Sequence, residues 1–125
     1  MAWFDGRKYW LLTLADEAAM QQAAPKQSAA WRELDVAVLH TLVIDHVLGI
    51  SLDRVAGEQH ISYHRDAREA EQLVKTGDAN CCFFLRATQP LQVCEVARAG
   101  DVMPQKSTDF YPKMLSGLAM YALDA

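Results

Sequence analysis

The chain has 125 residues, of which 51% are hydrophobic and 22% are charged, and it carries a formal net charge of −4. This length supports one hydrophobic core and not two, and the composition is that of an ordinary globular domain. The acidic balance disfavours nucleic-acid binding, which usually depends on a basic face.

No membrane segment and no export signal are expected. The most apolar stretch, residues 36–50, is interrupted by two histidines and an aspartate, which argues against a transmembrane helix. The N-terminus lacks the basic and apolar segments of a signal peptide. Cys81 and Cys82 are adjacent and Cys94 stands alone, without the spacing of a disulfide framework. We therefore expect reduced cysteines in a cytoplasmic protein.

A β-hairpin is predicted near the N-terminus. Asp5-Gly6 lies between Trp3-Phe4 and the apolar run of residues 8–14, and Asp-Gly between apolar runs is the strongest short-range hairpin signal. The first arm is a stub of about three residues, which would leave a sheet edge poorly paired. We expect the missing partner upstream, so that the chain is a fragment or the C-terminal domain of a longer protein.

Helical patterns follow the hairpin. Residues 15–33 are rich in Ala and Gln and contain Pro25, which predicts a short helix and then a polar connection. Apolar residues then recur at helical spacing over residues 36–50 and occupy nearly every side, so this helix should be buried on more than one side. Asp35 is the expected N-cap and Gly49 the expected end.

The second half is predicted to alternate strands and helices. Helices are expected at residues 66–75 and 90–99, and strands at 60–64, 79–87 and 117–123. The segment 79–87 contains the nearly continuous apolar run of residues 81–85, which is typical of a central strand covered on both faces. The order is β-α-β-α-β-α-β, and the fold class is α+β, a single domain with helices packed on a small mixed sheet.

The loop between Gly100 and Gly117 is the strongest candidate for a binding site. Two prolines fix its backbone, and the loop also carries two lysines, the hydroxyl groups of Ser107 and Thr108, and a run of backbone N–H groups. Lysine supplies charge while hydroxyl and amide groups supply directed donors, so such a loop can hold an anion. It is not a P-loop, because the glycines are missing and no helix is expected to follow. The alternative is a structural connection that Phe110 and Tyr111 fix to the core.

No metal site and no catalytic nucleophile are predicted. His60 and His64 are separated by about 13 Å if they lie on a strand, and His40 and His46 face different sides of a helix. His40 is expected to be a hydrogen-bonded core histidine. The adjacent cysteines lie within an expected strand, where inert thiols are found, and no nucleophile signature is present.

Several segments, in order, carry a resemblance to a known family. The most specific is residues 99–113, continued by Ser116-Gly117-Leu118. The others are Lys8-Tyr9-Trp10-Leu11-Leu12, Leu34-Asp35-Val36, Val38-Leu39-His40, Leu48-Gly49-Ile50, Ile61-Ser62-Tyr63 and, with Gly77, Phe83-Phe84-Leu85. Over nearly its whole length the chain resembles the C-terminal region of an uncharacterised bacterial family, domain of unknown function 1015. The family usually has proline where Gln105 stands and a bulky residue where Asp109 stands, so Asp109 brings a negative charge into the loop.

The resemblance implies a larger parent protein. Members of the family are about three times longer, with further motifs upstream. The family is also similar to the ParB and sulfiredoxin-like superfamily, which includes nucleotide-dependent free-serine kinases. On that link the upstream part would hold a nucleotide, and the Lys106 loop would add phosphate or substrate contacts.

The predicted function is binding of a phosphate- or carboxylate-bearing small molecule, with kinase-like phosphotransfer in the parent as the implied chemistry. Lys106 and Lys113 would neutralise charge, Ser107 and Thr108 would donate hydrogen bonds, and Tyr111 would shape the wall. The sequence does not decide whether the chain is an enzyme. The alternative is a non-catalytic interaction module, in which the helix at residues 36–50 binds the missing N-terminal region or a second copy.

Overall fold

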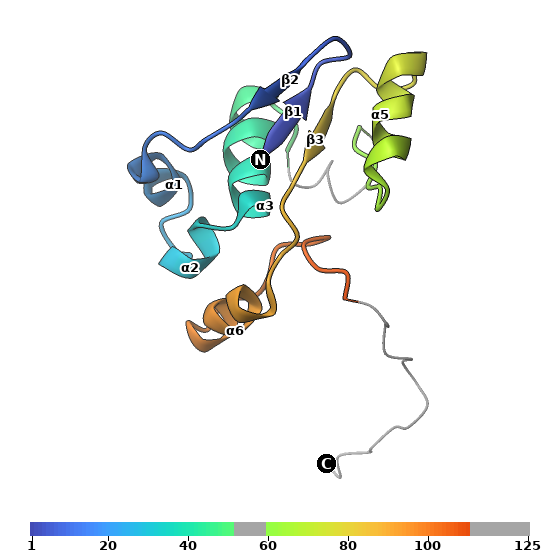
Figure 1. Cartoon of the computed structure of the whole chain (residues 1–125). Helices are drawn as coiled ribbons and strands as arrows, with labels where there is room; N and C mark the ends of the chain where they lie inside the picture. The colour runs from blue at the N-terminus through green and yellow to red at the C-terminus, as the bar shows by residue number, and fades with distance from the viewer. Residues whose placement is uncertain (52–59, 111–125) are drawn as a thin grey trace, which may run out of the picture.

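The computed structural model describes residues 1–51 and 60–110 and has the α+β class that the sequence predicts (Figure 1). Its elements, in chain order, are β1 (Ala2–Phe4), β2 (Tyr9–Leu11), α1 (Glu17–Ala23), α2 (Ala29–Arg32), α3 (Asp35–Val38), the π-helix η1 (Leu39–Val47), α5 (Ala67–Thr76), β3 (Cys82–Phe84) and α6 (Pro90–Arg98). None of the helices in these two described ranges is long and apolar enough to cross a membrane.

The three strands form one antiparallel sheet in the order β2-β1-β3. Trp3 of β1 lies opposite Trp10 of β2 on one side and opposite Phe83 of β3 on the other. The short first arm of the hairpin is therefore the central strand, and the vacant edge expected beside it is occupied by β3. The expectation for residues 79–87 was wrong in length and position, because only three of them pair and β3 lies at a sheet edge.

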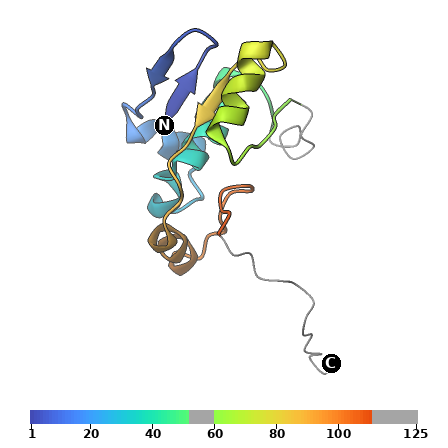
Figure 2. The ribbon, with the colours of Figure 1, turned by 45° about the vertical axis from the view of Figure 1, so that its right-hand side comes forward.

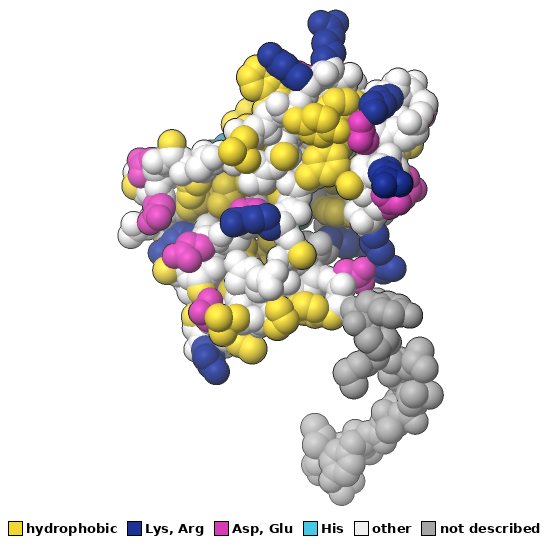
Figure 3. All heavy atoms as spheres, viewed as in Figure 1, with side chains coloured by type: hydrophobic (Ala, Val, Ile, Leu, Met, Phe, Trp, Pro, Cys, Tyr) yellow, Lys and Arg dark blue, Asp and Glu magenta, His cyan; other side chains and the backbone are white. Residues whose placement is uncertain are grey.

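The two faces of the sheet carry different aromatic groups. Trp3, Trp10 and Phe83 stack on one face, where Phe83 packs against Leu39 and Ile44 of η1. Figure 1 shows η1 and α3 behind the sheet. The opposite face carries Phe4, Tyr9 and Phe84, one from each strand; Tyr9 stacks on Phe4 and lies tilted against Phe84. Figure 3 shows hydrophobic side chains gathered over the sheet. Sheet residues thus contact the π-helix on one side and leave apolar surface on the other.

The helix predicted over residues 36–50 forms, with two differences. It begins one residue earlier, since Leu34 occupies the N-cap position and Asp35 the first helical turn. From Leu39 its turns widen into a π-helix, as in the hydrogen bond of 2.9 Å from the Leu48 N–H to the Val43 carbonyl. Residues 36–40 are buried in succession, which matches the prediction of burial on more than one side, whereas residues 46–49 are exposed. Gly49 ends the helix with φ +67°.

The main core joins helices that lie far apart in the sequence. Met20 of α1, Leu34 before α3 and Val96 of α6 are the largest fully buried side chains of the described residues. Burial of such residues is the main favourable contribution to folding. It fixes α6, and the loop that follows it, below the sheet (Figures 1 and 2).

Of the other predicted elements, the helices are observed and one strand is not. The predicted helices α5 and α6 are confirmed, and Asp66 caps α5 by accepting a 2.8 Å hydrogen bond from the Arg68 N–H. Residues 60–64 are irregular and do not form the expected strand. Residues 15–33 contain a second helix, α2, where a polar connection was expected. The strand expected at 117–123 lies outside the described residues.

Candidate anion-binding cleft

The loop that the sequence singled out starts at a well-defined helix end. Gly100 has φ +82°, and its N–H donates to the Ala97 carbonyl at 3.0 Å while the Asp101 N–H donates to the Val96 carbonyl at 3.1 Å. This pair of bonds is a Schellman motif, which favours glycine at the left-handed position. The Asp101 carboxylate then accepts a 2.6 Å hydrogen bond from the Ser28 N–H. The start of the loop is thereby fixed to the N-terminus of α2.

A tight turn follows at Gln105 and Lys106. Lys106 has φ +58°, which makes it the one residue other than glycine in the described ranges with a positive φ. The Ser107 hydroxyl donates to the Pro104 carbonyl at 2.5 Å and closes the turn. The Thr88 hydroxyl donates to the Ser107 carbonyl at 2.8 Å, which ties the loop to the connection between β3 and α6.

This turn forms one wall of a cleft of about 560 Å³. Three separate segments line it: residues 34–36 at the start of α3, residues 85–89 with Gln92 from the β3–α6 connection, and residues 106–110 of the loop. Polar connections between regular elements are common places for binding sites because the elements hold them rigidly. The cleft has the size and mixed lining of a small-molecule site.

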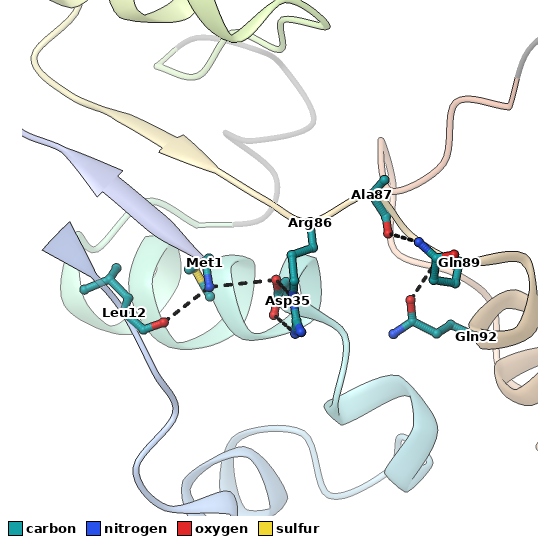
Figure 4. Close-up of polar contacts among 7 residues, drawn as sticks. All are labelled: Met1, Leu12, Asp35, Arg86, Ala87, Gln89 and Gln92. Carbon is teal, nitrogen blue, oxygen red and sulfur yellow. Dashed lines mark hydrogen bonds and ion pairs between the residues drawn. The ribbon is translucent and has the colours of Figure 1, made fainter. Parts of the chain in front are cut away.

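Both carboxylates in the lining are neutralised by arginines. Asp35 accepts two hydrogen bonds from Arg86, each of 3.0 Å (Figure 4). Asp109 forms an ion pair with Arg65, whose Nε lies 2.5 Å and whose Nη2 lies 3.1 Å from its two oxygens. The charge that Asp109 brings to the loop therefore has a partner 44 residues away.

The hydrogen bonds from Arg86 hold the pKa of Asp35 below its usual value, against the opposing effect of burial. The same carboxylate raises the pKa of Arg86, which is cationic in any case. The amino nitrogen of Met1 lies 3.8 Å from Asp35 and donates to the Leu12 carbonyl at 3.3 Å. Asp35 is thus an ionised group beside the cleft at neutral pH.

Three of the five predicted ligand-binding residues line this cleft: Lys106, Ser107 and Thr108. The other two, Tyr111 and Lys113, lie outside the described residues. Because the Ser107 hydroxyl donates its proton to Pro104, it is left to act as an acceptor, which corrects its predicted role as a donor. The ammonium group of Lys106 also lies 5.7 Å from the centre of the Tyr63 ring.

Sequence reasoning missed the contributions of the β3–α6 connection. Arg86, Thr88 and Gln89 follow the apolar strand directly and precede Pro90, which opens α6. Polar residues at a strand-to-helix junction are a usable signal, because such junctions are exposed and rigidly held. The Gln89 N–H donates to Gln92 Oε1 at 2.9 Å, so part of this polar lining serves to cap the helix (Figure 4).

The remaining candidates support no chemistry of their own. The described ranges hold no group of three His, Cys, Asp or Glu side chains that suits a metal ion. His40 is buried in η1 with its ring edge toward Tyr63, at 6.5 Å between centroids, and burial lowers its pKa. Burial likewise raises the pKa of the Cys82 thiol, which disfavours the reactive thiolate.

A second cleft, of about 500 Å³, lies on the other side of the Asp35–Arg86 pair. Apolar side chains of the hairpin and α1 line it, with charged groups that include Glu33 and Arg32. Asp35 and Arg86 are the two residues that the linings of both clefts share.

No protein-family model, curated protein or solved structure matches this chain. The resemblance to domain of unknown function 1015 stays a prediction, and a function has to be argued from the cleft itself.

Proposed function

We propose that the cleft between the 106–110 loop and the β3–α6 connection binds a small anionic ligand that carries a phosphate or carboxylate group. The observation that carries the proposal is that two cationic side chains, Lys106 and Arg86, come from distant segments to line one cleft. Thr108, exposed in the same lining, adds a hydroxyl group. Charge-assisted hydrogen bonds from such cations are the strong ones in anion recognition.

The proposed activity is binding within a larger enzyme. Within the described lining, no nucleophile is paired with a general base, so this chain would supply ligand contacts and not the reacting group. The resemblance to domain of unknown function 1015, and through it to the ParB and sulfiredoxin-like superfamily, belongs to this proposal. In it the upstream part of a cytoplasmic bacterial parent supplies a nucleotide site for phosphotransfer, and this chain, as a fragment of that parent, completes the site.

The test replaces Lys106 by asparagine and measures anion binding. Asn tolerates the left-handed conformation of this turn, so Lys106→Asn removes the charge without straining the backbone. Calorimetric titration and thermal-shift measurements with inorganic phosphate, phosphoserine and ATP should show binding to the unsubstituted chain. The variant should bind about tenfold more weakly.

Lys26→Asn is the matched control, since Lys26 is exposed on the α1–α2 connection, away from the cleft lining. Lys26→Asn changes the net charge equally and should bind these anions as tightly as the unsubstituted chain does. The proposal is wrong if the two variants bind the anions with equal affinity, or if none of these anions stabilises the unsubstituted chain.

A second candidate is the interaction module, and one observation favours it. Val47 and Leu48, at the exposed end of η1, are 74% and 49% exposed. An adjacent pair of exposed aliphatic side chains suits contact with the upstream region or with a second copy of the chain.

A further inference from the structure

The ion pair between Arg86 and Asp35 is asymmetric in its exposure. Both bonds between them are 3.0 Å long, so the guanidinium holds the carboxylate with two nitrogens (Figure 4). The Arg86 side chain is nevertheless 82% exposed, whereas that of Asp35 is 17% exposed. The carboxylate is held in the fold, and the cation reaches it from the solvent side.

The position of this pair makes an exchange of partners practicable. The long side chain of Arg86 starts from the connection after β3 and lies at the boundary of the two clefts, both of which it lines. Solvent screens an ion pair whose cation is exposed, so for Arg86 a change of partner costs less than it would in a fully buried pair. Asp35 keeps a favourable place without Arg86, since it lies in the first turn of the continuous α3–η1 helix, where negative charge is stabilised.

We propose that Arg86 is a ligand-binding residue of the anion cleft and that Asp35 is its internal competitor. The inference rests on the proposed function and adds a regulation to it. The incoming phosphate or carboxylate displaces the Asp35 carboxylate from the guanidinium and takes over its two hydrogen bonds. The ion pair therefore lowers the apparent affinity for anions, and it selects ligands with two oxygens placed to accept from one planar fork.

The same geometry assigns different roles to the two cations of the cleft. Lysine is a compact point charge that accepts many anion geometries, whereas the arginine fork requires a bidentate partner. Lys106 therefore supplies general attraction for anions. Arg86 supplies the preference for a carboxylate or a terminal phosphate over a monodentate anion such as chloride.

The test compares inorganic phosphate and ATP binding, by calorimetry at fixed ionic strength, in the intact chain and in Asp35→Asn, Arg86→Gln and the double variant. Asp35→Asn should strengthen binding several-fold, because Arg86 no longer has to leave a carboxylate. Arg86→Gln should weaken it about tenfold. In the double variant the gain from Asp35→Asn should vanish, because its effect acts through Arg86.

Glu33→Gln controls for net charge, since Glu33 lines the second cleft and not the anion cleft. Equal gains in Glu33→Gln and Asp35→Asn would reduce the effect to bulk electrostatics and overturn the competition. A gain from Asp35→Asn that persists without Arg86 would overturn it as well.

Arg86→Lys gives a second measurement if Asp35→Asn folds poorly. It keeps the charge but not the fork, so phosphate affinity should fall while chloride competition is unchanged, and equal phosphate affinity would contradict the proposal. Binding that depends on Lys106 but on neither Arg86 nor Asp35 would leave the proposed function standing and remove this inference. An intact chain that binds no anion would remove both.

Discussion

Asp5 organises the hairpin through its side chain. One carboxylate oxygen accepts hydrogen bonds from the backbone N–H groups of Arg7 and Lys8, at 2.8 and 2.9 Å, and the other accepts from the Trp10 indole at 2.9 Å. The Lys8 ammonium group lies 3.8 Å from the centre of the Trp10 ring. The indole bond, followed by the two backbone bonds, lowers the pKa of Asp5 to about 2.

This shift predicts how the hairpin responds to acid. The folded pKa of about 2 lies below the 3.8 of an unperturbed aspartate, so the ionised group stabilises the fold above about pH 4. That contribution is lost as the pH falls toward 2. An NMR titration of the side-chain carboxyl of Asp5 should give the low pKa, and Trp10→Phe should raise it by removing the largest cause. An Asp5 carboxyl that titrates near 3.8 in the intact chain would contradict the bonding.

Residue-scale features could be predicted from the sequence where their causes were local. The Asp5-Gly6 turn and the Asp66 cap are confirmed. Both could be predicted because their hydrogen bonds join residues within a few positions of each other. The pairing of Asp109 with Arg65 and of Asp35 with Arg86 joins residues 44 and 51 positions apart. No spacing rule predicts such pairs, so the compensation of charge in the cleft could be found only from the fold.

At the scale of elements, the end of α6 controls where the candidate cleft begins. The left-handed Gly100 lets the chain reverse, and the Asp101 carboxylate then contacts Ser28 at the start of α2. The hydrogen bonds from Ser28 lower the pKa of Asp101. The loop therefore leaves the helix in a direction fixed by backbone conformation, and its cationic turn is placed by that exit.

Gly100→Ala should destabilise the chain by about 1–2 kcal/mol, the approximate cost of a left-handed L-residue. Nothing lies within 4 Å of the added methyl group, so the effect is conformational and not steric. Denaturant unfolding followed by circular dichroism measures it. Gly100→Asn is the control and should cost less, because asparagine tolerates this region. Equal stability of Gly100→Ala and the unsubstituted chain would refute the role of the left-handed conformation at Gly100.

Helices were predicted better than strands, for a physical reason. A helix satisfies its hydrogen bonds within one segment, so the caps and periodicity of α5 and α6 were enough to locate them. A strand depends on neighbours from elsewhere, and residues 60–64 found none in the described sheet. The π-helical turns of η1 were missed because apolar residues on nearly every side give no sharp period to read.

At the scale of the whole molecule, the described sheet is small, and the helices contribute most of the core. Three strands of three residues each pair in the sheet, whereas the larger buried cluster joins α1, α3 and α6. Val96 at full burial fixes α6 beside α2 and α3. The cleft therefore depends on the core, since its walls belong to segments that this packing brings together.

The chain also exposes apolar surface outside the cleft, at Val47 and Leu48, which neither the core nor the sheet covers. If this surface binds a second copy, the chain should associate at concentrations of about 100 µM or below, which corresponds to modest affinity. Val47→Lys with Leu48→Lys should then weaken association by tenfold or more, because burial of each side chain contributes about 1.5–3 kcal/mol. Sedimentation equilibrium measures the effect.

Leu11→Lys is the control for this experiment, because Leu11 is equally apolar and 83% exposed but lies on β2. Folding should survive in both variants, since neither replaces a buried side chain. Association lost only in the Val47 and Leu48 variant would assign the contact to the end of η1, and equal loss in both would indicate nonspecific hydrophobic attraction. A chain that stays monomeric over this range would exclude a second copy as the partner and leave the upstream region of the proposed larger parent as the other candidate for that surface.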